Sequence, residues 1–317
     1  MISLISTLFN ENENLQLFLD DIKNQTQKPE EVVFVDAGST DGSFELMAGK
    51  LKTLVKEGCN RSEGRNLAIN EAKGDVIAVC DGGTRLDSNW LKILTAHFKD
   101  PNIHVVSGFF KPDARTFFEK CLSSATIPIL EEIEEEKFLP SSRSLAFRRQ
   151  VWKDVKGYPQ WLPVCEDLIF DIKLKKNGFT FKFEPKAIVY WRPRKNIQAF
   201  FKQYYMYAKG DGHAKLWFAR HVIRYTAYFT GLLLIYLSFS VSFLWLLPFF
   251  AAQLGYFSKF YYRYMGHFEQ DPEYKIGAAF PLISFLVVTG DIAKMVGYPV
   301  GIYERVTKKI KFEEYRK

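Results

Sequence analysis

Two aspartates of the sequence each follow a short apolar run that predicts a buried strand. The run VVFV at 32–35 leads into Asp36, and DVIAVC at 75–80 leads into Asp81. Strands separated by helices form parallel sheets, which bind ligands beyond the carboxyl ends of their strands. A carboxylate at that edge can accept hydrogen bonds from a ligand or help to hold a cation. A solvated aspartate at one strand end is common, whereas two at corresponding ends favour a binding site.

A further acidic feature, the pair Glu166-Asp167, opens a helix that we predict near 167–177 and that stops at Gly178. Carboxylates at a helix start usually cap the helix or interact with its dipole. A carboxylate can also act as a general base that takes a proton from a reacting hydroxyl. The pair by itself leaves both interpretations open.

The elements that must position these side chains alternate along the first two thirds of the chain. Strands are predicted at 2–9, 32–35, 75–80, 103–107, 144–147, 179–183 and 187–190, and helices at about 13–23, 62–73, 90–98 and 167–177. This alternation predicts an α/β fold. The segment 111–142 is less regular and carries an acidic run at 131–136. That run indicates a solvated helix face or mobile loop, with a lid over a substrate as the alternative.

The last third of the chain predicts a membrane protein. Residues 225–257 form a run of 33 residues without a charge, whereas a spanning helix needs only about 20 apolar residues. Residues 151–317 carry 25 Lys and Arg against 13 Asp and Glu, while residues 1–150 carry 18 against 23. A basic half suits phosphate groups, and the hydropathy favours those of a bilayer or a lipid carrier over nucleic acid.

The cysteines and the start of the sequence indicate the compartment. The 4 cysteines show no CxxC spacing, which excludes the usual zinc motifs and a dense disulfide framework. We therefore expect reduced thiols in a cytosolic compartment. The opening residues MISLISTLFNENEN have no basic leader and soon become acidic, so no signal peptide is predicted.

A tight hairpin at about 225–260 is the preferred arrangement of the charge-free run, with one long tilted helix as the alternative. Basic residues flank the run on both sides, so the positive-inside rule predicts a multi-pass protein of the cell membrane with both termini in the cytoplasm. A third apolar stretch at 276–290 has only 15 residues and contains Pro281. We predict an interfacial or re-entrant segment at about 276–300, then a basic tail at 305–317. Aromatic and basic residues at 196–224 predict amphipathic juxtamembrane helices that touch anionic lipid.

Four sequence blocks, taken in order, resemble the inverting glycosyltransferases of family 2. They are ISTLFNENENL, VVFVDAGSTDGS, SEGRNLAINEAKGDVIAVCDGG and GYPQWLPVCEDLIFDIKLKKNGF, within about residues 1–212. The resemblance implies the GT-A fold, a Rossmann-like mixed sheet with flanking helices, as a catalytic domain at 1–195. C-terminal transmembrane or interfacial helices at 225–317 would follow it.

The resemblance also implies where a nucleotide-sugar donor binds. The implied donor-binding residues are Thr7, Asn10, Glu11, Asp36, Arg65, Asn66 and Asp81. The first three would lie beside the base and ribose, and Asp36 would accept hydrogen bonds from the base, which suits an acceptor-only carboxylate. Arg65 and Asn66 would face the diphosphate, although a surface pair with a carboxylate is an equal alternative for Arg65.

Asp81 matches the first aspartate of the family's DxD motif, which holds a divalent cation, Mn²⁺ or Mg²⁺, against the donor diphosphate. A hard cation neutralises the leaving group as the sugar bond breaks. The string Asp81-Gly82-Gly83 lacks the second aspartate and departs from the pattern. Asp87 is a substitute ligand on one interpretation and a helix cap on the other.

The acceptor side is implied by the last block. Asp167 matches the family's general base, with Glu166 as its orienting neighbour, and Trp161 could offer an apolar face to the acceptor. Processive relatives show QxxRW where this chain has QYYMY. Gln203 and Tyr207 are retained as acceptor-binding candidates, and the mismatch favours a single transfer over polymerisation.

The sequence therefore predicts a membrane-anchored glycosyltransferase that moves one sugar, with inversion, onto a lipid-linked or membrane-proximal acceptor at the cytoplasmic membrane face. A catalytically silent nucleotide-sugar-binding or scaffold subunit is the main alternative, because the DxD motif is incomplete. A nucleotidyltransferase would need a glycine-rich phosphate loop near the N-terminus, and residues 8–15 contain no glycine.

Overall fold

The computed structural model describes residues 1–272 and 274–308. The chain divides into two compact units. The first comprises Met1–Asp113 with Leu130–Arg192, and the second comprises Ala114–Ile129 with the described chain from Pro193 to Lys308. Most of the predicted basic tail at 305–317 lies outside the described residues.

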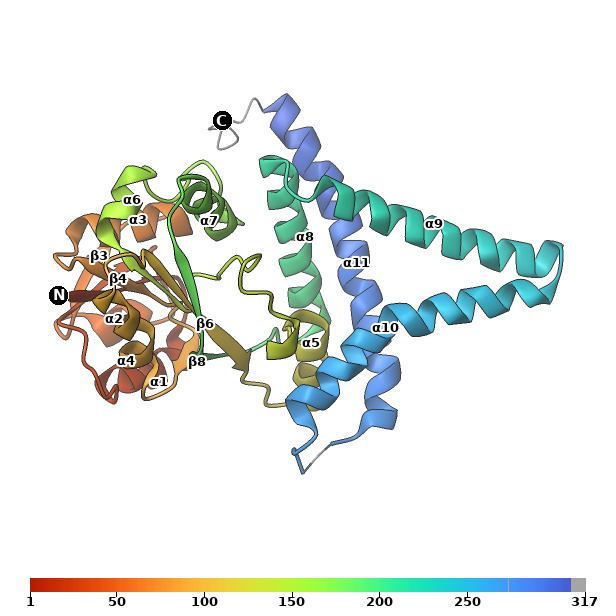
Figure 1. Ribbon diagram of the computed structural model, residues 1–317, viewed down its shortest axis with the longest axis horizontal. Coiled ribbons are helices and arrows are strands. Elements are labelled where there is room, and N and C mark those ends of the chain that lie inside the picture. The colour runs from red at the N-terminus through yellow and green to blue at the C-terminus, as the bar shows by residue number, and fades with distance from the viewer. Residues whose placement is uncertain (273, 309–317) are drawn as a thin grey trace. The chain divides into compact units, whose positions relative to one another are not determined.

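One eight-stranded sheet organises the first unit (Figure 1), in the order β3-β2-β1-β4-β7-β6-β8-β5. Strands β1, β2, β3 and β4 pair in parallel, whereas β7 runs antiparallel to both of its neighbours. The carboxyl ends of β1, β2 and β4 therefore meet at one edge of the sheet. The strands are β1 (Ile2–Leu8), β2 (Glu31–Asp36), β3 (Lys52–Val55), β4 (Val76–Val79), β5 (Thr84–Leu86), β6 (Val105–Pro112), β7 (Leu145–Arg148) and β8 (Phe181–Trp191).

Helices cover both faces of this sheet because its central strands are apolar on both sides. Side chains alternate between the faces of a strand, so Leu4 and Phe34 join one core cluster while Ile5 and Val33 join the other. The first cluster includes residues of α1 (Asn12–Lys23), α2 (Ser43–Met47) and α4 (Trp90–Thr95), and the second includes residues of α3 (Arg61–Glu71), α6 (Arg149–Asp154) and α7 (Glu166–Lys176). The predicted α/β fold is confirmed.

The glutamates of the acidic segment are exposed to solvent, and specific contacts hold the segment in place. Helix α5 (Phe117–Thr126) precedes it, and only Leu130–Glu132 of the run is helical, as a single 3-10 turn. The Glu135 carboxylate accepts hydrogen bonds from Lys182 Nζ at 2.9 Å and the Phe183 N–H at 3.1 Å. Lys175 of α7 donates to the carbonyls of Glu136 and Phe138, each at 2.8 Å. The segment thus lies along α7 and β8.

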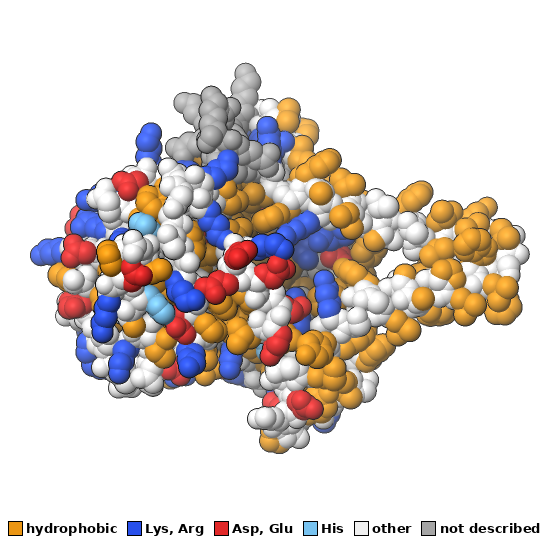
Figure 2. All heavy atoms as spheres, in the orientation of Figure 1, with side chains coloured by type: hydrophobic (Ala, Val, Ile, Leu, Met, Phe, Trp, Pro, Cys, Tyr) orange, Lys and Arg blue, Asp and Glu red, His pale blue; other side chains and the backbone are white. Residues whose placement is uncertain are grey.

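The second unit contains four long helices. They are α8 (Ile197–Ala214), α9 (Phe218–Ser240), α10 (Leu246–Phe268) and α11 (Ile276–Thr307). A turn at 241–245 joins α9 to α10, so the charge-free run forms two helices in place of one (Figure 1). Hydrophobic side chains gather over these two helices (Figure 2), and many are exposed to solvent, Phe239 by 88%. Among the described helices, α9 and α11 are long and apolar enough to cross a membrane.

Helix α11 has 32 residues and continues through Pro281 and Pro299, where the sequence indicated a 15-residue apolar stretch. A proline lacks the N–H that would bond to the carbonyl four residues earlier. For Pro299 that carbonyl belongs to Met295, and the Tyr225 hydroxyl of α9 donates a hydrogen bond to it. A neighbouring helix therefore compensates for the missing bond, and the helix continues.

Asp291, in the middle of α11, is paired by neighbouring helices. Its side chain is only 3% exposed, and Arg224 Nε of α9 lies 2.8 Å from its Oδ1. The hydroxyls of Tyr228 and Tyr256 donate to its Oδ2. Because a buried charge is costly unless it is paired and hydrogen-bonded, this network offsets the cost of placing Asp291 in an apolar helix.

Helices α8 and α11 approach closely because glycines line their contact. A Cβ added to Gly301 would lie 2.1 Å from the Lys209 carbonyl oxygen, and one added to Gly297 would lie 2.3 Å from that of Tyr205. Small residues four apart allow two helix backbones to touch in this way. The contact cannot accept even a methyl group without separating the helices.

We expect Gly301→Ala to lower the thermal stability of the protein in detergent, since the new methyl group meets backbone and cannot be accommodated by a rotamer change. The matched control is Gly277→Ala on the same helix, where an added Cβ meets nothing within 4 Å. That control should be neutral or stabilising by up to about 1 kcal/mol, because alanine favours the helix. Equal effects of the two substitutions on the melting temperature would contradict the close packing.

Candidate active site

Asp36, at the carboxyl end of β2, is 1% exposed and has one oxygen available to a ligand. Its Oδ1 accepts the N–H groups of Gly38 at 2.9 Å and Ser39 at 2.8 Å. Its Oδ2 and the Thr7 hydroxyl are buried, and no side chain or backbone group in the described chain bonds to either. Since buried polar atoms are normally paired, these two atoms suit a ligand that brings hydrogen-bond donors.

The loops that follow β1 and β2 are tied together beside Asp36. Asn10 adopts a left-handed backbone, with φ 54°, and its side-chain oxygen accepts the Thr40 N–H at 2.9 Å. The Asn10 N–H donates to Ser39 Oγ at 2.9 Å, and the Glu11 N–H donates to Ser43 Oγ at 3.0 Å. The loop that carries Asn10 and Glu11 is therefore held at the carboxyl edge of the sheet.

Arg65 of α3 joins the donor and acceptor blocks. The residue is 3% exposed, and its guanidinium lies 3.0 Å from Asp81 Oδ1 and 2.6 Å from Glu166 Oε1. The sequence left two roles open for Arg65, namely contact with the diphosphate or a surface pair with a carboxylate. Pairing with carboxylates is present, but it is buried. Burial raises the pKa of Glu166, although the positive charge of Arg65 acts to lower it. Burial also acts to raise the pKa of Asp81, but Arg65, Arg143 and Arg61 outweigh it and hold that pKa low.

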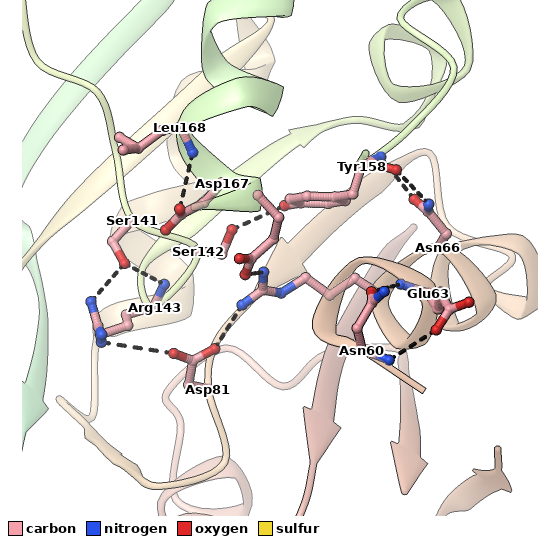
Figure 3. A network of polar contacts seen from close by, with 12 residues as sticks. Asn60, Glu63, Asn66, Asp81, Ser141, Ser142, Arg143, Tyr158, Asp167 and Leu168 are labelled. Carbon is pink, nitrogen blue, oxygen red and sulfur yellow. Dashed lines mark hydrogen bonds and ion pairs between the residues drawn. The ribbon is translucent and has the colours of Figure 1, made fainter. Parts of the chain in front are cut away.

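Arg143 is a site residue that sequence reasoning missed. Its Nε lies 3.7 Å from Asp81 Oδ2, and its guanidinium lies over the Trp191 ring, 4.4 Å from the ring centroid. Figure 3 shows Arg143 and Ser141 on the side of Asp81 away from Asn60. A lone arginine in an irregular segment has no spacing signal, so only the folded chain reveals this contact.

Asn66, predicted to face the diphosphate, is hydrogen-bonded to the protein. Its amide donates to the Tyr158 carbonyl at 2.8 Å (Figure 3). Its oxygen accepts the Trp152 indole N–H and the Tyr158 N–H, both at 2.9 Å. These bonds fasten α3 to the loop before α7, and the role of Asn66 toward a donor stays a prediction.

Glu166 and Asp167 occupy the first turn of α7 but lie in different surroundings. Glu166 is 4% exposed and engaged by Arg65, whereas Asp167 is half-buried and its Oδ1 accepts the Leu168 N–H at 2.9 Å. One turn further, Asp171 is fully buried without a hydrogen-bond partner among the described residues, and burial raises its pKa well above the ordinary value. Asp167 is thus the acidic side chain of this turn most accessible to an acceptor.

The remaining candidates come from three other places in the chain. Trp161 is half-buried in the loop that precedes α7. Asp87 Oδ1 accepts the Asn89 N–H at 2.9 Å in the turn that precedes α4. Gln203 and Tyr207 lie on α8 in the second unit, where the Gln203 amide donates to the Tyr207 hydroxyl at 3.0 Å.

The residues that could hold a metal are few. Within residues 1–272 and 274–308, no group of three or more His, Cys, Asp or Glu side chains is arranged to hold a metal ion. Asp81 offers a carboxylate that its arginine neighbours keep ionised. Any cation here would take further oxygen ligands from elsewhere, the donor diphosphate included.

The fold resembles that of a known sugar-transferring enzyme. A mannosyltransferase from Pyrobaculum calidifontis, solved in complex with GDP-Man and Mn²⁺, matches with a TM-score of 0.52 and 17% identity over 97% of this chain and 87% of that chain. This likeness concerns the fold, which is GT-A.

Sequence comparison also finds glycosyltransferases. Residues 3–149 match the model of glycosyl transferase family 2. The O-antigen chain rhamnosyltransferase RfbN of Salmonella typhimurium is 28% identical over 223 residues, which are 63% of this chain and 70% of that protein. The glycosyltransferase AglE of Haloferax volcanii is 25% identical over 228 residues, or 68% and 74%. Together, the family match and these relatives show that the protein is a glycosyltransferase, which transfers a sugar from a nucleotide-sugar donor.

Arg65→Met tests the central ion pairs. We expect it to destabilise the protein by about 3–5 kcal/mol near neutral pH, the usual cost of removing one partner from buried charges. Without Arg65, the pKa of Glu166 rises further above its unfolded value, and the pKa of Asp81 rises as well. The folded variant then binds more protons than the unfolded chain, and its stability rises as the pH falls.

Thermal unfolding at pH 8 and pH 5 measures this effect. The loss of stability of Arg65→Met relative to wild type should be smaller at pH 5 than at pH 8. The control is Arg194→Met, which removes an exposed arginine that follows β8. If the Arg65 variant showed the same deficit at both pH values, the two carboxyls would not depend on that guanidinium for their charge.

Proposed function

We propose that this glycosyltransferase moves a single sugar, with inversion of the anomeric centre, from a nucleotide-sugar donor to a lipid-linked or membrane-proximal acceptor. The observation that supports it most is the buried guanidinium of Arg65, which contacts both Asp81 and Glu166. Arg65 thereby links Asp81, which follows β4 and is implied in donor binding, to the first turn of α7, where Asp167 is implied in proton removal. Leaving-group charge and acceptor proton would then be handled within one connected network.

On the donor side, the base would bond to Asp36 Oδ2, the buried oxygen without a partner among the described residues. Its neighbour Oδ1 is already held by two backbone N–H groups, which fix the carboxylate in orientation. Arg143 and Arg65 lie on either side of Asp81 and would place positive charge near the diphosphate. Arginine suits this task because its planar guanidinium matches phosphate oxygens.

A divalent cation fits the same edge of the sheet. Asp81 supplies an ionised oxygen ligand just after β4. The mannosyltransferase of Pyrobaculum calidifontis, which shares this fold, was solved in complex with GDP-Man and Mn²⁺, and this supports the assignment. When bound, the cation would neutralise the negative charge that develops on the departing diphosphate.

Transfer itself requires the acceptor hydroxyl to lose its proton as it attacks. Asp167 would accept that proton while the hydroxyl oxygen bonds to the anomeric carbon from the face opposite the nucleotide. The bond between that carbon and the diphosphate oxygen breaks, and the nucleoside diphosphate leaves with the electron pair. Glu166 would hold α7 in place through Arg65 instead of exchanging protons, because its carboxylate is buried in that ion pair.

The acceptor class is inferred from the second unit. Its helical hairpin exposes apolar side chains that water would not favour, and two of its helices have the length and composition to cross a membrane. Basic residues flank the hairpin on both sides, which favours a cytoplasmic location for both flanks. A membrane-anchored transferase with this orientation would meet acceptors carried by lipid, and its basic surface would contact anionic lipid.

Asp167→Asn should lower the rate of sugar transfer by on the order of 10²–10⁴-fold, the range for loss of a general base. The substitution removes the basic oxygen but preserves size, so nucleotide affinity should be unchanged. The measurements are nucleoside diphosphate release in the presence of a membrane extract and nucleotide binding by calorimetry. The control is Asp154→Asn, an exposed aspartate of α6. Wild-type turnover by the Asp167 variant would remove this residue from the mechanism.

Cysteine labelling tests the membrane arrangement, in a background where the half-buried Cys59 is replaced by serine. A cysteine at Lys202 should be shielded from an impermeant thiol reagent in intact cells and should react once the membrane is opened. A cysteine at Ser242, in the turn of the hairpin, should react from outside if both helices cross. Labelling at Lys202 in intact cells would reverse the orientation, and shielding at Ser242 would mean that the hairpin does not cross.

A further inference from the structure

The string Asp81-Gly82-Gly83 has glycine where the family motif has its second aspartate, and the structure shows what occupies the space. A Cβ added to Gly83 would lie 2.7 Å from Oε2 and 3.6 Å from Oε1 of Glu11. A contact of 2.7 Å is closer than a side-chain carbon can approach an oxygen without displacement. The carboxylate of Glu11 therefore occupies the position into which a side chain at residue 83 would project.

The preceding glycine is equally constrained. A Cβ added to Gly82 would lie 1.8 Å from a methyl carbon of Leu8, a fully buried core residue at the end of β1. The strand end of β1 and the turn after β4 are thus pressed together. This close approach brings Glu11, three residues after Leu8, to the backbone of Gly83.

The backbone of Glu11 holds this residue in place, and its side chain does not cap the helix. Its N–H donates to Ser43 Oγ at 3.0 Å, and its carbonyl accepts the N–H groups of Asn14 and Leu15 in α1. It stands at the N-cap of α1, yet its side chain makes no capping hydrogen bond there. The carboxylate is directed to the Gly83 backbone instead.

We propose that Glu11 supplies the second acidic ligand that the motif lacks, so that Asp81 and Glu11 together hold a divalent cation against the donor diphosphate. This inference rests on the proposed function, because it assumes that the diphosphate binds beside Asp81. Glu11 would then act at the cation, and not beside the base and ribose as the family resemblance implied. The two oxygen-bearing side chains come from different strand ends.

The charges around Asp81 indicate when the cation would bind. Arg65 and Arg143 both lie close to that carboxylate, so a cation arriving alone would meet two positive neighbours. The diphosphate would compensate those charges and add oxygen ligands of its own. We therefore expect weak Mn²⁺ binding to the free protein and much tighter binding when a nucleoside diphosphate is present.

The test compares Mn²⁺ affinity with nucleotide affinity. The variants are Glu11→Gln, the double variant Glu11→Gly/Gly83→Asp, and the control Glu13→Gln, which removes an exposed carboxylate paired with Arg192. The double variant moves the carboxylate from residue 11 to residue 83 and relieves the contact between them. Mn²⁺ binding is followed by electron paramagnetic resonance with whichever of UDP, GDP, CDP or dTDP stabilises the wild type most. Affinity for the same nucleotide is measured separately in EDTA.

Glu11→Gln should lower Mn²⁺ affinity by at least about tenfold and leave nucleotide affinity in EDTA unchanged, and the double variant should regain most of the Mn²⁺ affinity. Thermal unfolding of each variant identifies any loss of fold. If Glu11→Gln does not fold, the Mn²⁺ affinity of the double variant tests the proposal in its place. Unchanged Mn²⁺ affinity in Glu11→Gln would overturn the proposal, and so would an equal fall in nucleotide affinity in EDTA. Absence of nucleotide-dependent Mn²⁺ binding by the wild type would also overturn it.

These readouts are independent of sugar transfer. If the wild type binds Mn²⁺ and nucleotide through Glu11 but transfers no sugar to any acceptor in a membrane extract, the cation assignment stands and the proposed transfer fails. If transfer occurs but Mn²⁺ affinity ignores Glu11, the transfer stands and the cation assignment fails.

Discussion

The buried guanidinium of Arg65 is the interaction on which the active site depends. A charged residue that is only 3% exposed is tolerated only when its charge is paired and hydrogen-bonded. Arg65 meets that condition through Asp81 and Glu166. Each of those carboxylates is, in turn, stabilised in its charged form by the same guanidinium. The turn after β4 and the first turn of α7 are thus held in register by one side chain, which leaves Asp167 beside them for chemistry.

Close backbone approach is the second constraint, and glycine provides it in each unit. In the first unit, Gly82 and Gly83 let the turn after β4 pack on Leu8 and Glu11. In the second unit, Gly297 and Gly301 let α11 pack on the backbone of α8. At these positions a methyl group has no space, so the identity of the residue follows from packing and not from backbone flexibility.

Polar groups inside the apolar helices of the second unit are satisfied by neighbouring helices. Tyr225 bonds to the carbonyl that Pro299 leaves without a helical donor, and Arg224 with two tyrosines pairs Asp291. In an apolar environment an unpaired polar group costs several kcal/mol. The same contacts that lower this cost also specify which helix faces meet.

The sequence by itself determined the α/β fold, the placement of Asp36 and Asp81 at strand ends, the helix that begins at Glu166-Asp167, and the apolar run that becomes α9 and α10. These features have local signals, namely runs of apolar residues, their spacing and the turn residues between them. Only the tertiary structure decided that Arg65 pairs with carboxylates 16 and 101 residues away, that Arg143 joins them, and that Glu11 lies beside Gly83. It also decided that α11 continues through its prolines. Such contacts depend on strand order and helix packing, which bring distant residues together and leave no periodic trace along the chain.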